Sequence, residues 1–253
     1  MKSQKVRFCV KKVLNTVIFL LYYKLVSNFA VAMTKFRKIV LNVPHSSIDK
    51  WGEGWDSPDG IWCHVKDFTD WYTDILFHND MCSMVRFPCS RFYCDAERLK
   101  NDPMEKIGQG ICYTSYGDFK RVKVPDVMGL WQSHQEALSK EIVEGTLLID
   151  CHSFPSKVCD DVDICIGFNS DWSKPSDDVL SVLINAFEGM GLRVGINHPY
   201  SNSITPDCDI KYQSVMIEVN KRVYMNEGTL LPISDAFERF KSLLGDIYKQ
   251  LLQ

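Results

Sequence analysis

The chain has 253 residues, of which 45% are hydrophobic and 24% are charged, and its formal net charge is −3. These values exclude a disordered, collagen-like or coiled-coil protein, and they lack the basic excess that is typical of nucleic-acid-binding proteins. The 10 cysteines are too few for a small disulfide scaffold. The length allows one large domain or two small ones, with a sizeable core in either case.

The first 32 residues have two interpretations, and neither makes them part of the fold. Residues 1–12 are rich in lysine and arginine, an apolar run covers 13–23, and Ala30-Val31-Ala32 follows. These are the parts of a secretory signal peptide, and the run is shorter than the roughly 20 apolar residues of a membrane span. The run is also interrupted by polar residues. We therefore favour the second interpretation, in which Met33 is the true start and residues 1–32 are an upstream extension of a cytoplasmic protein.

The remaining residues, 33–253, are expected to form one domain in which strands alternate with helices. Continuous apolar or β-branched runs predict the strands, and apolar residues at helical spacing predict the helices. This alternation predicts an α/β fold with a mixed, mostly parallel sheet flanked by helices. We expect strands at 38–43, 84–88, 146–151, 163–168, 192–197 and 212–219. We expect helices at 67–79, 124–144, 177–190 and 232–252, a loop at 51–66, and a long surface segment at 90–116.

The cysteines do not have the spacing of a structural zinc site, because the sequence contains no CxxC pair. Cys94, Cys151 and Cys165 lie within apolar runs, where cysteine acts as a small buried hydrophobic residue. Cys151 precedes His152, but neighbours along a strand point to opposite faces, so these two side chains do not form a nucleophile pair. We expect the cysteines to be reduced, as in the cytosol.

Polar residues gather where the strands are expected to end, which is where ligands bind in open α/β sheets. His45 follows the first predicted strand, and Asp150 and His152 close the third. Glu218 lies near the end of the last strand, and Asp70 lies early in the first predicted helix. Two histidines and one carboxylate are the ligand set of a catalytic zinc site, and a further carboxylate such as Glu218 serves as general base. Taken singly, each residue also has a structural interpretation, as a backbone hydrogen-bond partner or a helix cap.

The other histidines have weaker claims to a site. His134 lies on the apolar stripe of a predicted helix and is expected to be a hydrogen-bonded interior residue, whereas His78 is expected on the surface. His64 lies in the loop rich in tryptophan and is a possible substrate contact. His198 lies beside the expected site.

Arg91 and Arg98 lie at the start of the long segment. Arginine binds carboxylates through two parallel hydrogen bonds, so this pair predicts an anionic small molecule as the substrate. The alternative is that the two arginines form surface ion pairs with Asp95 or Glu97, which would contribute little to stability.

Six short motifs hold nearly all of these residues in order between about residues 38 and 226. They are Val43-Pro44-His45-Ser46-Ser47, Phe68-Thr69-Asp70, Ser90-Arg91-Phe92-Tyr93-Cys94-Asp95 with Arg98, Asp150-Cys151-His152-Ser153-Phe154-Pro155, Asn197-His198-Pro199-Tyr200, and Ile217-Glu218-Val219-Asn220 with Tyr224. No single motif is specific, but six in this order and spacing are hard to obtain by chance. The set resembles the N-formylglutamate amidohydrolase family.

The resemblance implies a zinc-dependent hydrolase with a fold similar to zinc carboxypeptidases. Members cleave the amide of N-formyl-L-glutamate to formate and glutamate, a late step of histidine degradation. Carried over, the resemblance implies His45, Asp70 and His152 as ligands of one zinc ion per chain, with Asp49 as the rival of Asp70. It implies Glu218 as the general base. The implied substrate-binding residues are Arg91, Arg98, Asn197, Tyr200 and Asn220.

Two positions depart from the family pattern, and both concern substrate recognition. Glu97 stands where the family usually has asparagine, and Asn202 stands where it has glycine. An acid beside Arg98 would weaken its affinity for an anionic substrate. The metal set is complete, and Asp150 is expected to orient a ligand histidine. Metal-dependent amide hydrolysis is therefore better supported than formylglutamate as the substrate.

Three alternatives remain open at this point. A zinc peptidase acting on a small peptide or cell-wall fragment would share the metal set. A metal-free binding module could have kept the fold without the chemistry, and in a purely structural interpretation the histidines only satisfy the core. The acyl group, the amino acid and the oligomeric state remain open, and we expect neither a nucleic-acid partner nor a stable membrane span.

Overall fold

The computed structural model describes residues 35–253, so the expectations for residues 1–32 lie outside the described part of the chain. The main sheet has six strands in the order β2-β1-β5-β8-β6-β7. Its strands are β1 (Lys38–Val43), β2 (Ser83–Arg86), β5 (Thr146–Phe154), β6 (Ile164–Gly167), β7 (Val194–Ile196) and β8 (Gln213–Asn220). Two small hairpins are formed by β3 (Ser115–Tyr116) with β4 (Phe119–Lys120), and by β9 (Met225–Asn226) with β10 (Leu231–Pro232).

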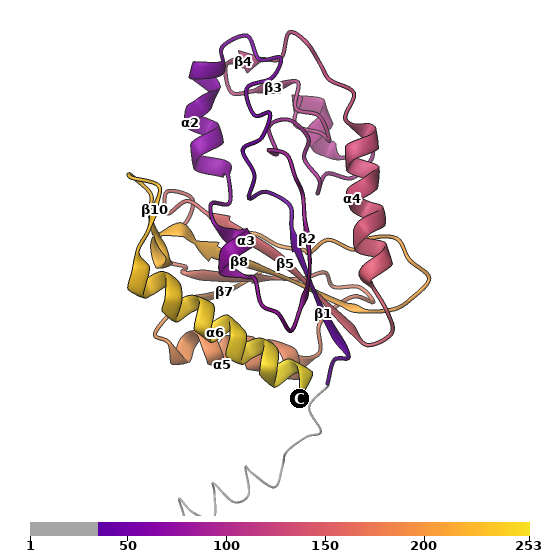
Figure 1. The fold of residues 1–253 in the computed structure, drawn as a ribbon, viewed down its shortest axis with the longest axis vertical. Helices are drawn as coiled ribbons and strands as arrows, with labels where there is room; N and C mark the ends of the chain where they lie inside the picture. Colours follow the sequence, from indigo (N-terminus) through magenta and orange to yellow (C-terminus); the bar gives the residue numbers. More distant parts are fainter. Residues whose placement is uncertain (1–34) are drawn as a thin grey trace, which may run out of the picture. The chain divides into compact units, whose positions relative to one another are not determined.

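The sheet is mixed and mostly parallel, as the sequence predicts. Strands β2, β1, β5 and β8 are parallel to one another, β6 is antiparallel to β8, and β7 is parallel to β6. Strand β5 lies near the middle of the sheet, and all nine of its residues are buried. A strand covered on both faces must be apolar almost throughout, which explains its continuous apolar run. The polar residues at the carboxyl end of β5 are therefore exceptions. Figure 1 shows β5 beside β8 in this sheet.

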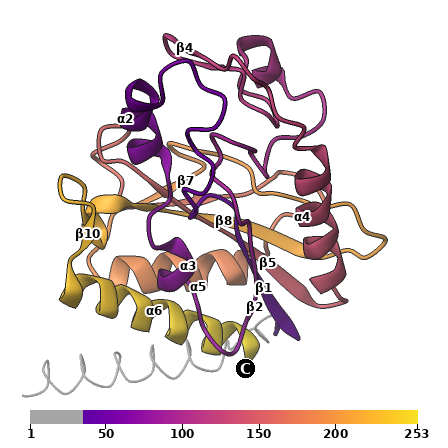
Figure 2. The ribbon, with the colours of Figure 1, turned by 45° about the horizontal axis from the view of Figure 1, so that its top comes forward.

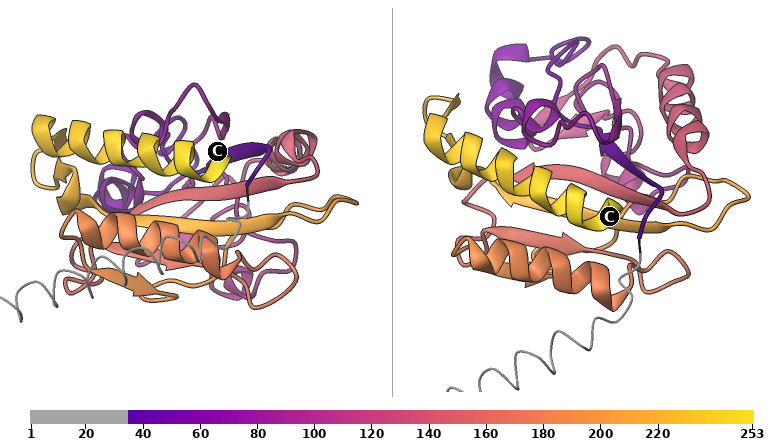
Figure 3. Two further views of the ribbon diagram at one scale, coloured as in Figure 1. Left: turned by 90° about the horizontal axis from the view of Figure 1, so that it is seen from below. Right: turned by 60° about the horizontal axis from the view of Figure 1, so that its bottom comes forward.

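Helices cover both faces of the sheet. They are α2 (Pro58–Phe68), α3 (Thr73–Leu76), α4 (Met128–Glu141), α5 (Asp177–Gly189) and α6 (Ser234–Leu252), and 3₁₀ turns occur at Pro103–Ile107 and Lys221–Val223. Figures 2 and 3 show α5 and α6 side by side on one face, with α4 on the other. Phe187 of α5 and Phe240 of α6 stack with ring centroids 5.9 Å apart. His134 and Leu138 are buried on α4, as its predicted stripe requires.

The segment 51–79 differs from its prediction, because the helix lies earlier than expected. Helix α2 occupies much of the predicted loop, with Pro58 in its first turn and the Ser57 side chain accepting a hydrogen bond from the backbone of Gly60. A serine before a proline is an ordinary start signal for a helix. The single helix predicted over 67–79 is wrong, because the chain turns at Tyr72 with a φ of 65°, and only the end of α2 and the short helix α3 fall within that range. Asp70 lies in that turn, just after α2.

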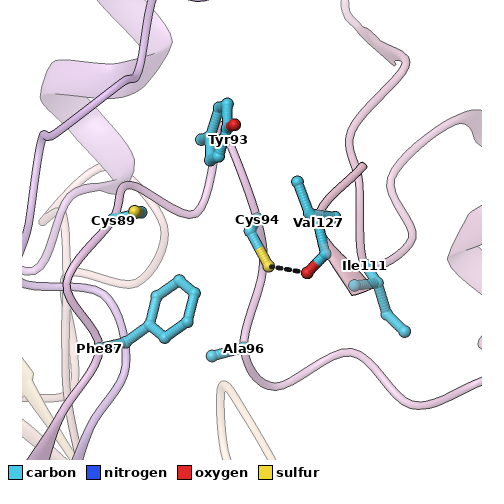
Figure 4. Close-up of a cluster of buried hydrophobic side chains, with 7 residues drawn as sticks. All are labelled: Phe87, Cys89, Tyr93, Cys94, Ala96, Ile111 and Val127. Atoms are coloured by element: carbon cyan, nitrogen blue, oxygen red, sulfur yellow. Dashed lines mark hydrogen bonds between the residues drawn. The ribbon is translucent and has the colours of Figure 1, made fainter. Parts of the chain in front are cut away.

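The segment 90–116 is not a surface segment along its first part, which corrects the sequence prediction. A cluster of buried side chains anchors it beside the start of α4 (Figure 4). Within it the Cys94 thiol is directed at the backbone oxygen of Val127, 3.9 Å away. The cluster consists of Phe87, Cys89, Tyr93, Cys94, Ala96, Ile111 and Val127. The residues between Arg91 and Arg98 are consequently held by the core.

Two further observations bear on the sequence analysis. Cys94, Cys151 and Cys165 are fully buried, as predicted, and the nine described cysteines are all free thiols. Within residues 35–253, none of the helices combines the length and the apolar character that crossing a membrane requires.

The packing of α6 against α5 is testable by removing one ring. Phe240→Ala should lower the free energy of unfolding by about 3–5 kcal/mol, because the ring is fully buried and its loss leaves a cavity. Leu231→Ala is the control, since Leu231 is 61% exposed and its truncation should change stability by no more than about 0.5 kcal/mol. Urea denaturation followed by circular dichroism measures both. Equal effects in the two variants would contradict the packing described.

Candidate functional site

A cavity of about 310 Å³ opens at the carboxyl ends of β1, β5 and β8. Carboxyl ends of parallel strands meet at one edge of a sheet, so loops from distant parts of the sequence contribute to one cavity. Its lining includes most of the residues singled out from the sequence: His45, Asp70, Arg91, Glu97, Arg98, His152, Tyr200 and Glu218.

Strand register places the central residues of the site on one face of the sheet. On β5, Asp150 and His152 are two residues apart and therefore share a face, while Cys151 between them points to the other face. His152 pairs in register with Glu218 of β8, and Asp150 pairs with Asn42 of β1. The period of two residues in a strand is thus what brings His152 and Glu218 side by side.

His45, Asp70 and His152 form a buried group that can hold a metal ion. Asp70 Oδ2 lies 3.0 Å from His152 Nδ1 and 3.7 Å from His45 Nδ1. His45 Nδ1 is buried without a hydrogen-bond partner. The backbone N–H of Asp70 donates to the carbonyl oxygen of His45, which fixes the turn after α2 against the loop after β1. The rival carboxylate, Asp49, is exposed and outside this group.

The far nitrogens of both histidine rings face other carboxylates. His45 Nε2 lies 2.9 Å from Asp95 Oδ1. His152 Nε2 lies 2.9 Å from Glu97 Oε2 and 3.2 Å from Asp150 Oδ1. Carboxylates in this position fix the orientation of metal-binding histidines and raise their basicity. The expected contact of Asp150 with a candidate ligand is present, and Glu97 faces the same ring.

These carboxylates shift the pKa values of the two histidines. Burial alone would lower the pKa of His152, but the negative charges of Glu97 and Asp150 raise it well above its ordinary value. Burial and Arg91 oppose protonation of His45, and Asp95 together with Asp70 outweighs them and raises its pKa. Without a metal, these raised pKa values favour the protonated form of the His45 and His152 imidazoles. A cation that binds there displaces those protons, so its affinity rises with pH.

Asn42 connects the site to α4 through buried hydrogen bonds. Its Nδ2 donates to Asp150 Oδ1 over 2.8 Å and to Glu97 Oε1 over 3.0 Å. Its Oδ1 lies 2.9 Å from His134 Nε2, which must donate because an amide oxygen only accepts. Burial lowers the pKa of His134 to about 4, so this ring is neutral. The sequence prediction of a hydrogen-bonded interior histidine is confirmed.

Asp95 is the common partner of both cavity arginines. Its Oδ2 lies 3.1 Å from an Arg91 guanidinium nitrogen, 3.6 Å from Arg98 Nε and 2.7 Å from the Tyr113 hydroxyl. Burial opposes its ionisation, but Arg91 and His45 hold the pKa of Asp95 well below its usual range. The alternative interpretation of the arginines was therefore right about the pairing with Asp95. However, Asp95 is fully buried, so these are not surface ion pairs.

Glu218 differs from the other carboxylates because one of its oxygens is uncommitted. Oε2 is buried without a hydrogen-bond partner, and the residue is 8% exposed at the cavity wall. Burial raises the pKa of Glu218 to about 7, and nearby His152 only partly offsets that effect. A buried carboxylate with a free oxygen and a pKa near neutrality can accept and return a proton.

Several predicted contacts do not line the cavity. Asn197 is exposed and accepts a hydrogen bond from the backbone of Phe168. Asn220 is buried, where it accepts from the hydroxyl of Ser156 and supports the loop after β5. Both therefore hold backbone in place. Likewise, the remaining histidines lie outside the cavity: His64 is on α2 beside Tyr116, and His78 and His198 are exposed.

The sequence analysis does not predict the roles of three residues that organise the site. Asn42 is a polar residue inside the apolar strand β1, which is a signal that a buried polar group needs partners. Asp95 was considered only as a surface partner of the arginines. Tyr113, which is nearly fully buried, carries no local signal because its role depends on the folding of a long segment over the sheet.

The fold and the site define an α/β protein with a buried group of two histidines and an aspartate that can bind a metal ion at the carboxyl edge of its sheet. Residues 37–225 match the N-formylglutamate amidohydrolase family, and the chain belongs to that family. It is thus a member of an amidohydrolase family, as the sequence motifs indicated.

Two solved structures share the fold. The N-formylglutamate amidohydrolase from Ralstonia eutropha JMP134 matches with a TM-score of 0.68 and 16% identity, over 86% of this chain and 94% of that chain. A gene product of Agrobacterium tumefaciens matches with a TM-score of 0.60 and 18% identity, over 87% of this chain and 93% of that chain. No curated protein sequence matches.

The dependence of the site on Asp95 can be tested through stability. Asp95→Asn should lower the free energy of unfolding at pH 7 by about 3–5 kcal/mol, because it leaves Arg91 without its buried counter-charge. A carboxylate with a lowered pKa stabilises the fold above its unfolded pKa and loses that contribution as the pH falls. The difference from the wild type should therefore shrink below about pH 4. Denaturation across pH measures it, and Glu238→Gln, at an exposed site, is the control.

Proposed function

We propose that the protein is a zinc-dependent amidohydrolase that cleaves the amide of an N-acyl amino acid such as N-formyl-L-glutamate, giving formate and glutamate. The observation that carries the proposal is the buried group of His45, Asp70 and His152 beside the uncommitted carboxylate of Glu218. Membership of the amidohydrolase family supports the same reaction class.

The donor atoms fit a metal ion. Two ligand atoms that are each about 2.1 Å from a tetrahedral zinc ion lie about 3.4 Å apart. The separations of Asp70 Oδ2 from His152 Nδ1 and His45 Nδ1, 3.0 Å and 3.7 Å, bracket that value. The unpartnered Nδ1 of His45 is the atom that such an ion would satisfy. Zinc held by these three residues would supply a Lewis acid that polarises the amide carbonyl and acidifies water.

The roles of the chain's own residues follow from their positions. Glu218 takes the proton from the attacking water and later returns it to the departing amine nitrogen, and its free oxygen at the cavity wall suits both steps. Asp95 holds the His45 ring through a hydrogen bond, and Asp150 and Glu97 place negative charge against the far nitrogen of the His152 ring. These outer contacts keep the reacting groups from moving when the substrate binds.

Arg91 and Arg98 are the groups that suit a substrate carboxylate. Both line the cavity, and Arg98 Nε is buried without a hydrogen-bond partner. Asp95 partly neutralises both guanidinium groups, so the remaining positive charge suits one carboxylate rather than a polyanion. Tyr200 lies on the cavity wall against Phe154 and closes its apolar side.

A peptide-like substrate is the second candidate, and one observation favours it. A further cavity of about 350 Å³ adjoins the first, and Arg91, Glu97 and Arg98 line both. The combined space is larger than an N-acyl amino acid requires. A substrate extended beyond the arginines would reach Asp102 and Asn169 on the far side.

A hydrolysis panel tests the proposed function. The metal-free protein is incubated with and without zinc, with a chelator control, and offered N-formyl-L-glutamate, N-acetyl-L-glutamate, N-formyl-L-alanine and short peptides. We expect zinc-dependent release of the acyl group, fastest with the acidic amino acids. Faster cleavage of peptides would favour the second candidate. Absence of both hydrolysis and bound metal would leave a binding module and overturn the proposal.

The role of Glu218 is tested by Glu218→Gln, which keeps size and removes the base. The variant should retain metal and fold while kcat falls roughly 100- to 10,000-fold. In the wild type, kcat/KM should fall on the acid side, because protonation removes the base; burial raises the pKa of this carboxyl to about 7, and a bound cation would lower it. Near-normal turnover by Glu218→Gln would show that another group is the base.

A further inference from the structure

A second group of possible metal ligands lies outside the cavity, on the loop after β5 and the loop after β7. Cys159 Sγ is 2.9 Å from Asp161 Oδ1 and 3.7 Å from His198 Nε2. The three donor atoms all lie within 4.8 Å of one another. Asp161 and His198 are exposed and Cys159 is half-buried, so a cation in solution has access to the group.

The backbone on the Cys159 side of this group is fixed by buried and charged partners. Asn220 Nδ2 donates to the carbonyl oxygen of Cys159 over 3.0 Å. Arg193 and Arg222 both donate to the carbonyl oxygen of the next residue, Asp160, over 2.7 Å. The position of the thiol therefore does not depend on a freely moving loop.

The position of His198 depends on a close approach between its own backbone and that of Gly195. A Cβ atom added at Gly195 would lie 2.4 Å from the carbonyl oxygen of His198, so only glycine allows the chain to fold back there. Asn197, the residue before His198, has a φ of 50°, and its side chain accepts a hydrogen bond from the backbone of Phe168. Together these features hold His198 near the thiol.

The chemistry of the three donors selects the kind of cation. A thiolate, an imidazole and a carboxylate suit zinc and similar transition metals, whereas magnesium and calcium prefer oxygen ligands alone. The positive charges nearby are already paired, since Arg193 and Arg222 both contact the carboxylate of Asp163 at 2.9 and 2.8 Å. On binding, the S–H bond of Cys159 breaks, a sulfur–metal bond forms, and the proton passes to solvent.

We propose that Cys159, Asp161 and His198 form a second site for a zinc-class cation, which clips together the segments 159–161 and 198–201. Tyr200 and Ser201 follow His198 closely and line the main cavity. Cys159 and Tyr200 both pack against the buried cluster of Phe154, Val162, Cys165 and Met216. The clip therefore fixes one wall of the cavity from outside. It takes no part in the chemistry assigned to the main site.

Cobalt(II) titration of the metal-free full-length protein tests the proposal. A thiolate bound to cobalt gives a charge-transfer band in the near ultraviolet, and the group of His45, Asp70 and His152 contains no sulfur. We expect this band in the wild type, reaching full intensity by about two equivalents per chain, because the main site also takes up cobalt. Cys159→Ser should reduce it at least tenfold, and His198→Ala should weaken cobalt affinity in this band at least tenfold.

Two control variants separate this site from others. Cys63→Ser removes an exposed cysteine that has no nearby ligand group and should leave the band unchanged. His45→Ala should also leave the band unchanged, because it alters only the main site. The proposal is overturned if the wild type shows no such band, if Cys159→Ser or His198→Ala leaves it intact, or if Cys63→Ser abolishes it.

Discussion

Buried negative charge at one edge of the sheet is the constraint on which the rest of this structure depends. Asp70, Asp95 and Asp150 are all nearly or fully buried, with Glu97 beside them. Taking several carboxylates out of water costs many kcal/mol unless cations and hydrogen-bond donors compensate. The two imidazoles and the two cavity arginines supply that compensation within the protein. Without a metal, protons on the two imidazoles supply some of this compensating positive charge. A bound divalent cation would supply it in their place.

This constraint explains why the long segment after β2 folds back over the sheet. The segment that follows β2 carries Asp95, Glu97 and both arginines, and its burial among the cluster around Cys94 keeps them at fixed distances from the histidines. A mobile loop could not hold a carboxylate 2.9 Å from a ring nitrogen. Hydrophobic packing beside the cavity thus sets the electrostatics inside it.

The fold and the centre of the site were largely predictable, because they depend on local patterns. Alternation of apolar strands with amphipathic helices indicated the α/β sheet, and the rule for strand ends selected His45, His152 and Glu218. The helix α2 was missed although Ser57 and Pro58 mark its start. The outer contacts of the histidines were mostly missed, because they join residues far apart in the chain, and no spacing in the sequence encodes them.

The alternation along β5 has a consequence for how this protein can change over time. His152 faces the cavity because it lies two positions after Asp150, while Cys151 between them fills the opposite side. Inserting or deleting one residue before this point would exchange the two faces and place a thiol where an imidazole belongs. The composition of the strand would hardly alter, yet the site would be lost. Length variation is therefore confined to the loops, whereas β5 tolerates substitution but not a shift in register.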